Sequence, residues 1–354
     1  MNITTDFKHS SPSKSLSEGG YEWWYFDGQS REGDFHFVII FYKSNPFSTK
    51  YIENLTDGIV DVLHPAISVS VYHKGKPVYY SFLEFGEPDF SWDEQEMELK
   101  VGGDLFNYRP KENKLLINIE LDQKLASGHG IQGTLKGEGR WSNPRLIHSE
   151  SNDRHAWNLL LPHMDWEVDL AVEGKKGSQN INFLGIGYHD HNTGQEPMKE
   201  SFRDWYWGRY HFKDFTLVYY LMQKHGEEQM EAWLIDQNNK TVLEYLTDSE
   251  LSDFGRNLFG LRSARKIELK SNQATVNIQY RNKIDDGPFY QRFIGDSIIK
   301  YKDQVFAAHG VSEYIYPKNI YNEMFWPLVH MRLRFMKKKP HWVQKSPLMY
   351  PWTW

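Results

Sequence analysis

A polar run with the residue types of a catalytic site lies near the middle of the chain. Residues 187–194 read Gly-Tyr-His-Asp-His-Asn-Thr-Gly and follow an apolar stretch. Alternate side chains of a β-strand share a face, so Tyr188, Asp190 and Asn192 are expected on one side. An aspartate between a phenol and an amide is suited to act as a general acid that its neighbours hold by hydrogen bonds.

The same alternation places His189 and His191 on the opposite face of that strand. A His-x-His pair can supply two ligands of a metal ion, but a metal site needs a third ligand from elsewhere. No supporting pattern such as His-Glu-x-x-His occurs in the chain. The third interpretation is a polar strand end whose side chains bond a turn. We assign no metal ligands.

A second candidate pair precedes this run. His155 and Trp157 are two positions apart and stand before the apolar residues 159–162, so on a strand both would face the same way. A buried histidine beside a tryptophan is more often a satisfied core residue than a catalyst. By itself the pair indicates no function.

The composition favours sheets and an apolar cavity. The chain has 354 residues, of which 16% are aromatic (13 Trp, 21 Tyr and 21 Phe). Aromatic side chains suit pleated, half-buried surfaces and also line ligand pockets. A net charge of −6 argues against a nucleic-acid partner. The absence of cysteine excludes disulfides, thiolate metal sites and cysteine nucleophiles.

Short β-rich segments separated by turn residues predict an all-β fold with few short helices, one of them around residues 249–257. Expected strands are Phe35–Tyr42, Ala66–His73, Leu115–Leu121, Trp166–Val172, Phe215–Met222 and Ala274–Tyr280. Two Trp-rich segments, residues 21–28 (YEWWYFDG) and 204–212 (DWYWGRYHF), each open a run of such strands. The pattern predicts two similar barrels or half-barrels, as domains 1–200 and 201–354. Recurrence of aromatic strands without a repeat is the alternative.

The first residues are polar, and no stretch approaches the length of a membrane span, so a soluble, cytoplasmic protein is expected. The C-terminal residues 325–354 mix bulky apolar side chains with arginine and lysine. Such a segment could touch a membrane peripherally. Our preferred interpretation is a last strand and tail that cover the mouth of a barrel.

Taken in order, these motifs resemble the carotenoid 1,2-hydratase (hydroxyneurosporene synthase) family and its AttH-like relatives. The resemblance covers roughly residues 20–210 and rests on four motifs: Tyr21–Gly28, His155-x-Trp157, Gly187–Asn192 and Trp205-x-Trp207. It implies two lipocalin-like domains and activity on isoprenoid or polyene double bonds without a cofactor. Histidines on both sides of Asp190, and Thr193 in place of an aromatic residue, depart from the hydratases.

The resemblance implies that Asp190 is the proton donor, with Tyr188 and His155 as the other catalytic residues. Alkene protonation needs a carboxyl group that is still protonated near neutral pH, whereas an aspartate in water titrates at about 3.9. An apolar pocket must therefore favour the neutral acid. Candidate substrate-binding residues are Trp23, Trp24, Tyr25, Trp157, Asn192, Trp205, Trp207 and Arg209.

Three functions remain open at this point. Admission of one oriented water to the carbocation gives hydration, and exclusion of water gives cyclisation. A Diels–Alder-type pericyclase would only hold the substrate in a reactive conformation. A non-catalytic carrier of a lipophilic ligand needs the pocket but not the polar residues around Asp190. That cluster therefore favours an enzyme.

Overall fold

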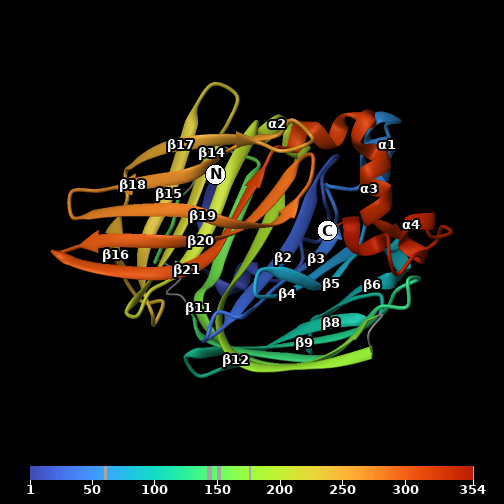
Figure 1. The fold of residues 1–354 in the computed structure, drawn as a ribbon, viewed down its shortest axis with the longest axis horizontal. Coiled ribbons are helices and arrows are strands. Elements are labelled where there is room, and N and C mark those ends of the chain that lie inside the picture. The colour runs from blue at the N-terminus through green and yellow to red at the C-terminus, as the bar shows by residue number, and fades with distance from the viewer. Residues whose placement is uncertain (60–61, 142–145, 150–152, 175–176, 354) are drawn as a thin grey trace. The chain divides into compact units, whose positions relative to one another are not determined.

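The computed structural model describes residues 1–59, 62–141, 146–149, 153–174 and 177–353. The chain forms two compact units, whose strands and helices are labelled in Figure 1. Unit 1 comprises Met1–Pro197 together with Glu323–Trp354, and unit 2 comprises Met198–Asn322. The predicted domains 1–200 and 201–354 are segments expected to fold independently, and that division stays a prediction.

Unit 1 is built on a 13-stranded sheet in the order β22-β5-β4-β3-β2-β12-β11-β10-β9-β8-β7-β6, with β1 paired to β11. The sheet curls on itself. Strands β5 and β9 are far apart in the sheet order, yet Tyr79 Oη on β5 donates to Gln123 Oε1 on β9 at 2.9 Å. Its strands are β1 (Asn2–Thr4), β2 (Tyr21–Ser30), β3 (Phe35–Ser44), β4 (Ala66–His73), β5 (Lys76–Glu84), β6 (Phe90–Asp93), β7 (Glu98–Val101), β8 (Asp104–Lys111), β9 (Lys114–Lys124), β10 (Gly130–Arg140), β11 (His155–Gly174), β12 (Gly177–Gly194) and β22 (Arg334–Phe335).

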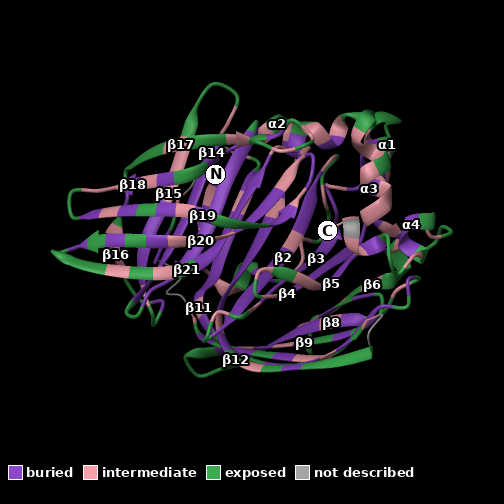
Figure 2. Cartoon of the chain, viewed as in Figure 1, coloured by how far each residue is buried: buried purple, intermediate pink, exposed green. Residues whose placement is uncertain are grey.

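The core of unit 1 fills the concave side of this sheet. On β2, Trp24 and Phe26 point into the core, where both rings pack against Phe106 of β8. The residues that alternate with them along the strand, Trp23 and Tyr25, lie on the convex face, as strand alternation requires. Figure 2 shows that β2 and β3 are buried along most of their length. Both faces of these strands are therefore shielded from solvent.

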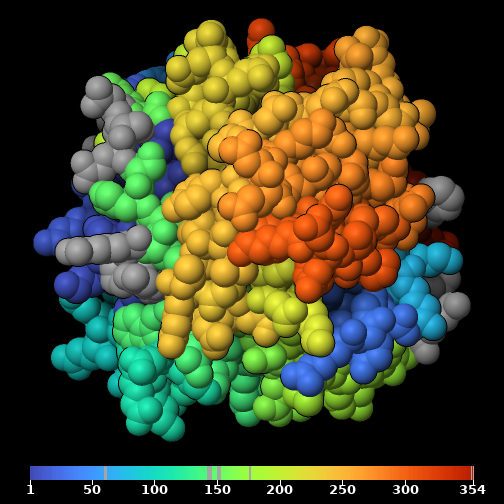
Figure 3. All heavy atoms as spheres, turned by 90° about the vertical axis from the view of Figure 1, so that its left-hand side faces the viewer, coloured from blue at the N-terminus to red at the C-terminus, as the bar shows by residue number. Residues whose placement is uncertain are grey.

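Unit 2 is a 9-stranded sheet in the order β16-β15-β14-β13-β21-β20-β19-β18-β17. It also curls, since Tyr301 on β20 donates to the carbonyl of Leu243 on β16 (3.2 Å). Figure 3 shows one surface of this unit, with β18 to β21 in orange. The strands are β13 (Asp204–His211), β14 (Phe215–Gln223), β15 (Glu228–Asp236), β16 (Val242–Tyr245), β17 (Asp248–Arg256), β18 (Arg262–Lys270), β19 (Ala274–Asp286), β20 (Tyr290–Tyr301) and β21 (Gln304–Ile315).

The two sheets repeat one topology. In each, a Trp-rich strand (β2 or β13) starts a meander of three further strands on one side. On its other side it pairs with a late strand of its own unit, β12 or β21. All six strands expected from the sequence are present, and the all-β, lipocalin-like fold class is confirmed.

The expected helix at residues 249–257 is wrong, because Asp248–Arg256 forms the edge strand β17. Backbone pairing with β18 determines this conformation, from Asp248↔Lys270 to Arg256↔Arg262. Most of its side chains are exposed or half-buried, so its own residues provide little periodic signal. Tertiary pairing outweighs local propensity here.

Helices are few and short. They are α1 (Thr49–Thr56), α2 (Met198–Ser201), α3 (Trp326–Arg332), α4 (Trp342–Lys345) and the 3-10 turns η1 (Phe7–His9), η2 (Glu87–Asp89), η3 (Pro317–Tyr321), η4 (Glu323–Phe325) and η5 (Tyr350–Thr353). Among the described residues, no helix combines the length and the apolar character that crossing a bilayer requires. The C-terminal residues do contain a last strand, since β22 pairs in parallel with β5.

Candidate active site

Asp190 lies on β12 at the centre of a hydrogen-bonded cluster within unit 1. Tyr188 Oη donates to its Oδ2 at 2.6 Å, Trp157 Nε1 donates to the same oxygen at 2.7 Å, and Asn192 Nδ2 donates to Oδ1 at 2.8 Å. Tyr188 and Asn192 flank Asp190 on one strand face, and Trp157 comes from β11 opposite Asn192. The structure thus brings together four of the residues singled out in the sequence.

This carboxyl group is almost completely removed from water. Asp190 is 4% exposed, and both Tyr188 and Trp157 are fully buried. Burial opposes the ionised form of a carboxyl group, whereas hydrogen bonds from donors favour it. Burial, with the nearby charge of Asp190 as the next cause, raises the pKa of Tyr188 well above its ordinary value, so the phenol keeps its proton and donates.

His155 lies on the same face, two residues before Trp157 on β11. Its Nδ1 is 3.0 Å from Tyr21 Oη, and the Tyr21 ring stacks on Trp23 with centroids 5.3 Å apart. Gly194 stands between Tyr21 and His155 in the strand register. A Cβ at Gly194 would overlap the Tyr21 ring, so the glycine lets the phenol reach across to His155.

The histidines beside Asp190 point to the opposite face, into the core of unit 1. His189 Nδ1 is 2.9 Å from the Tyr25 carbonyl, and its Nε2 is 2.7 Å from Tyr108 Oη on β8. Burial lowers the pKa of His189 to about 3, so the ring is neutral, donates through Nδ1 and accepts at Nε2. Its ring stacks on Phe26 with a centroid distance of 4.1 Å.

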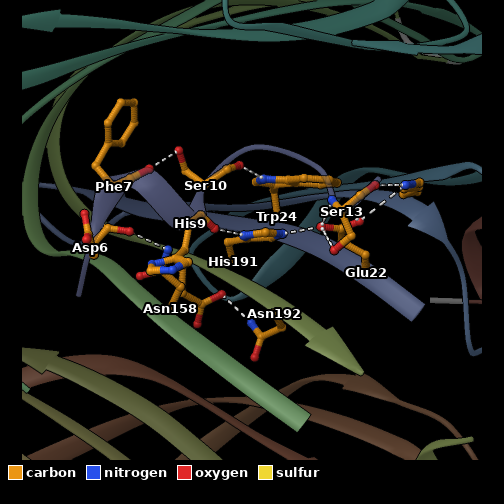
Figure 4. Close-up of polar contacts among 12 residues, drawn as sticks. Asp6, Phe7, His9, Ser10, Ser13, Glu22, Trp24, Asn158, His191 and Asn192 are labelled. Atoms are coloured by element: carbon orange, nitrogen blue, oxygen red, sulfur yellow. Dashed lines mark hydrogen bonds and ion pairs between the residues drawn. The ribbon is translucent and has the colours of Figure 1, made fainter. Parts of the chain in front are cut away.

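His191 bonds two oxygen acceptors, as Figure 4 shows. Its Nδ1 is 2.8 Å from the His9 carbonyl, and its Nε2 is 2.9 Å from Glu22 Oε1. Both ring nitrogens thus face oxygen atoms, and Nε2 contacts the buried carboxyl group of Glu22. The ring also stacks on Trp24 at 4.5 Å. This contact fixes β12 against β2 and the N-terminal residues.

The two histidines therefore do not join the Asp190 cluster. Among the described residues, no group of three or more histidine, aspartate or glutamate side chains has the arrangement of a metal site. Trp24 also faces the core, where its Nε1 donates to the Ser10 carbonyl at 2.9 Å. Trp23 and Tyr25 share the face of Asp190, and the Tyr25 and Tyr188 rings are 6.1 Å apart.

The remaining candidates belong to unit 2. Trp205, Trp207 and Arg209 are alternate residues of β13 and therefore share one face of that strand. All three are buried, and the Trp205 ring packs against Tyr220 with centroids 6.1 Å apart. Their role in substrate binding stays a prediction.

Two residues of the site face were not among the sequence candidates. Tyr21 contacts His155 as described, and Asp27 accepts from Tyr25 Oη at 3.3 Å while lying opposite Tyr188 in the register. Asp27 is fully buried. The signal was available, because alternation along β2 puts Tyr21, Trp23, Tyr25 and Asp27 on one face.

Solved structures share this fold. A putative AttH from Nitrosomonas europaea is 13% identical, with 88% of this chain and 96% of that chain covered and a TM-score of 0.59. CghA, solved with Sch210972, is 12% identical, with 85% and 89% covered and a TM-score of 0.61. The fold of this chain is therefore the lipocalin-like fold that these structures share. Residues 63–342 match the family model described as carotenoid hydratase CrtC, and the chain belongs to this family.

Curated relatives carry several names. "Hydroxyneurosporene dehydrogenase" of Chlorobaculum tepidum is 26% identical over 338 residues, which cover 90% of this chain and 88% of the relative. "Acyclic carotenoid 1,2-hydratase" of Thiocapsa roseopersicina is 28% identical over 60% of this chain and half of the relative. The "quinolone epoxide rearrangement protein asqO" of Emericella nidulans is 28% identical over 35% of this chain.

Proposed function

We propose that this protein is an enzyme that transfers a proton from Asp190 to a carbon–carbon double bond of a lipophilic terpenoid or polyene, without a cofactor. The observation that carries the proposal is the buried Asp190 carboxyl group with its convergent donors from Tyr188, Trp157 and Asn192. A ligand carrier would have no use for such a group. Family membership and the carotenoid hydratase relatives support a polyene substrate.

The hydrogen bonds of Asp190 favour one oxygen as the carrier of the transferable proton. Oδ2 of Asp190 already accepts hydrogen bonds from Trp157 and Tyr188, which engage both of its lone pairs. The neutral acid therefore carries its proton on Oδ1. Transfer of that proton to one alkene carbon uses the π electrons for the new C–H bond and leaves a cation on the other carbon. The rings of Trp23 and Tyr25 on the same face would each stabilise this cation by about 0.5–2 kcal/mol.

Hydration requires a water molecule and a base for its proton. The water oxygen forms the new C–O bond, its proton passes to a base, and return of a proton to Asp190 closes the cycle. His155 is the candidate base. It accepts a proton at Nε2 only if Nδ1 carries one, and then Nδ1–H donates to Tyr21 Oη across the 3.0 Å contact. Tyr21 is in this scheme a positioning residue.

A second candidate function is an isomerisation, by cyclisation or a pericyclic reaction, with no net addition of water. The similarity to the quinolone epoxide rearrangement protein favours it, since the reaction in that name is a rearrangement. The same acid serves such a reaction when water is kept away from the cation. A pericyclic reaction would need the pocket but no proton transfer.

Incubation of the purified protein with an acyclic polyene that ends in a trisubstituted double bond, in H₂¹⁸O, separates these functions. Hydration predicts a product heavier than the substrate by one labelled water. Isomerisation predicts a product of unchanged mass. Substrate recovered without change across a panel of acyclic terpenoids and polyenes, although the protein binds it, would contradict an enzyme and favour a carrier.

A further inference from the structure

The C-terminal segment, defined here as residues 324–353, has a charge opposite to that of the rest of the protein. From Met324 onward the chain contains no aspartate or glutamate, and it contains six basic residues, Arg332, Arg334, Lys337, Lys338, Lys339 and Lys345. Since the net charge of the chain is −6, this segment at +6 leaves −12 for residues 1–323. Such a separation concentrates positive potential on one part of unit 1.

The inner side of the segment is anchored to unit 1. Phe335 on β22 lies opposite Glu84 of β5, and Tyr350 Oη donates to the Tyr80 carbonyl at 3.2 Å. Val343 of α4 is buried. Helix α3 contacts α1 through His330 Nε2, which is 2.9 Å from Thr49 Oγ1 (Figure 1). The segment therefore has a fixed orientation on unit 1.

The outer side of the segment exposes large apolar side chains among the lysines. Trp342 and Leu348 are each 61% exposed, and Met336 and Met349 are 40% and 42% exposed. Lys337, Lys338, Lys339 and Lys345 are exposed as well, so exposed basic and apolar side chains occur together within residues 336–349. Figure 2 shows exposed stretches around α4. Water-exposed tryptophan, leucine and methionine beside lysines are typical of a surface that lies at a membrane interface.

Contacts around Phe335 show that the basic groups are close in space as well as in sequence. The ammonium groups of Lys50 and Lys338 lie 4.3 and 5.4 Å from the centre of its ring. Burial lowers the pKa of Lys50; Glu84 opposes this shift, and Lys338 and Lys337 add to it. Lys50 of α1 thus extends the basic surface beyond the C-terminal segment.

We propose that the outer side of the C-terminal segment docks on an anionic phospholipid surface. The lysines would meet the phosphate groups, and Trp342, Leu348 and the two methionines would enter the boundary between headgroups and acyl chains. If the proposed substrate is a lipophilic polyene, this surface brings the enzyme to the membrane in which such a molecule dissolves. Docking itself does not depend on the reaction, so the two proposals fail separately.

Flotation with lipid vesicles tests the docking proposal on the full-length protein. The probes are vesicles of phosphatidylcholine alone and of phosphatidylcholine with phosphatidylglycerol at about 3:1, in about 0.05 and about 0.5 M salt. We expect binding to the anionic vesicles at low salt, little binding to phosphatidylcholine, and release at high salt. Association with neither vesicle, or equal association with both, would overturn the proposal.

Variants locate the binding surface. Lys337→Gln, Lys338→Gln and Lys339→Gln together should weaken binding to anionic vesicles about a hundredfold, which corresponds to about 2.8 kcal/mol. The matched control replaces three exposed lysines elsewhere by glutamine, Lys136, Lys266 and Lys300, and should change binding less than threefold. An equal loss in both triple variants would mean a general charge effect and would refute the assignment to this segment.

A separate variant tests the apolar contribution. Trp342→Ala removes a ring that is 61% exposed, so stability should change little while vesicle binding falls about tenfold. Unchanged vesicle binding by Trp342→Ala, together with salt-sensitive binding of the wild type to a soluble acidic polypeptide, would replace the membrane by an acidic protein partner.

Discussion

Asp190→Asn is the substitution that most directly tests the proposed chemistry. The amide keeps the shape of the side chain but has no transferable acid proton at neutral pH, and loss of a general acid lowers rates by about 10²–10⁴-fold. The site can accept the amide. Its oxygen can still receive the bonds from Trp157 and Tyr188, and a flip of the Asn192 amide lets that side chain accept from the new NH₂ group.

The effect of Asp190→Asn on stability should be small for the same reason. In the proposed mechanism the resting carboxyl group is neutral, so the amide replaces one neutral hydrogen-bonding group by another, and each such bond contributes about 0.5–1.5 kcal/mol. We expect a change of about 1 kcal/mol or less in the free energy of unfolding. Asp190→Leu should cost more, because it leaves the buried donors of Trp157 and Tyr188 without this acceptor.

The assay is product formation under single-turnover conditions, with urea unfolding in parallel. The matched control is Asp165→Asn, because Asp165 is exposed on β11 and pairs at the surface with Arg31 at 3.5 Å. That control should keep full activity and stability. An Asp190→Asn protein that retains more than about a tenth of the wild-type rate would refute the general-acid mechanism and would favour a pericyclic reaction.

Three further predictions concern the surroundings of Asp190. Tyr21→Phe removes the phenol oxygen beside His155, so kcat for hydration should fall about tenfold, with a shifted pH profile and a nearly constant KM. An unchanged pH profile would mean that Tyr21 only packs against its neighbours. Gly194→Ala should mimic that loss, because the new Cβ displaces the Tyr21 ring. The matched control is Gly174→Ala, whose Cβ would come no closer than 3.6 Å to His129 Cδ2 and which should change activity little. His189 has a pKa of about 3 in the folded protein and about 6.5 in the unfolded chain, so only the unfolded chain binds a proton between these values, and stability falls as the pH drops below about 6.5. The free energy of unfolding measured in urea should therefore differ between pH 7.5 and pH 5 by about 2 kcal/mol less in His189→Asn than in the wild type. An equal pH dependence in both proteins would contradict a neutral buried ring.

The sequence predicts which side chains of a single strand share a face, because alternate residues of a strand point the same way. It placed Tyr188, Asp190 and Asn192 on one face, and the hydrogen bonds of the structure agree. The sequence predicts that Trp157 contacts substrate, and this stays a prediction; the structure adds that Trp157 donates to Asp190. That contact depends on how β11 pairs with β12, and the irregular register between Asn158 and Met164 cannot be read from either strand alone.

The contacts of the two histidines show the same limit. Sequence alternation put His189 and His191 on the face opposite Asp190, but their partners come from distant parts of the chain. Tyr108 is 81 residues from His189, and Glu22 is 169 residues from His191. Curling of the sheet and the path of the N-terminal residues create these contacts, and neither leaves a local pattern. Sequence spacing alone therefore does not determine whether His189 and His191 bind a metal ion, act in catalysis or pack in the core.

The pairing of β22 with β5 has a consequence for how unit 1 is completed during synthesis. Strand β5 is an edge of the sheet until residues 334–335 pair with it, and these residues emerge from the ribosome only after all of unit 2 has been made. Until then β5 presents unpaired backbone groups, which can template association with another chain. A chain interrupted after unit 2 would keep every strand around Asp190 and still expose this edge. Aggregation of nascent or truncated protein should therefore start at β5, because residues 334–335 are the ones that pair with this edge and cover it.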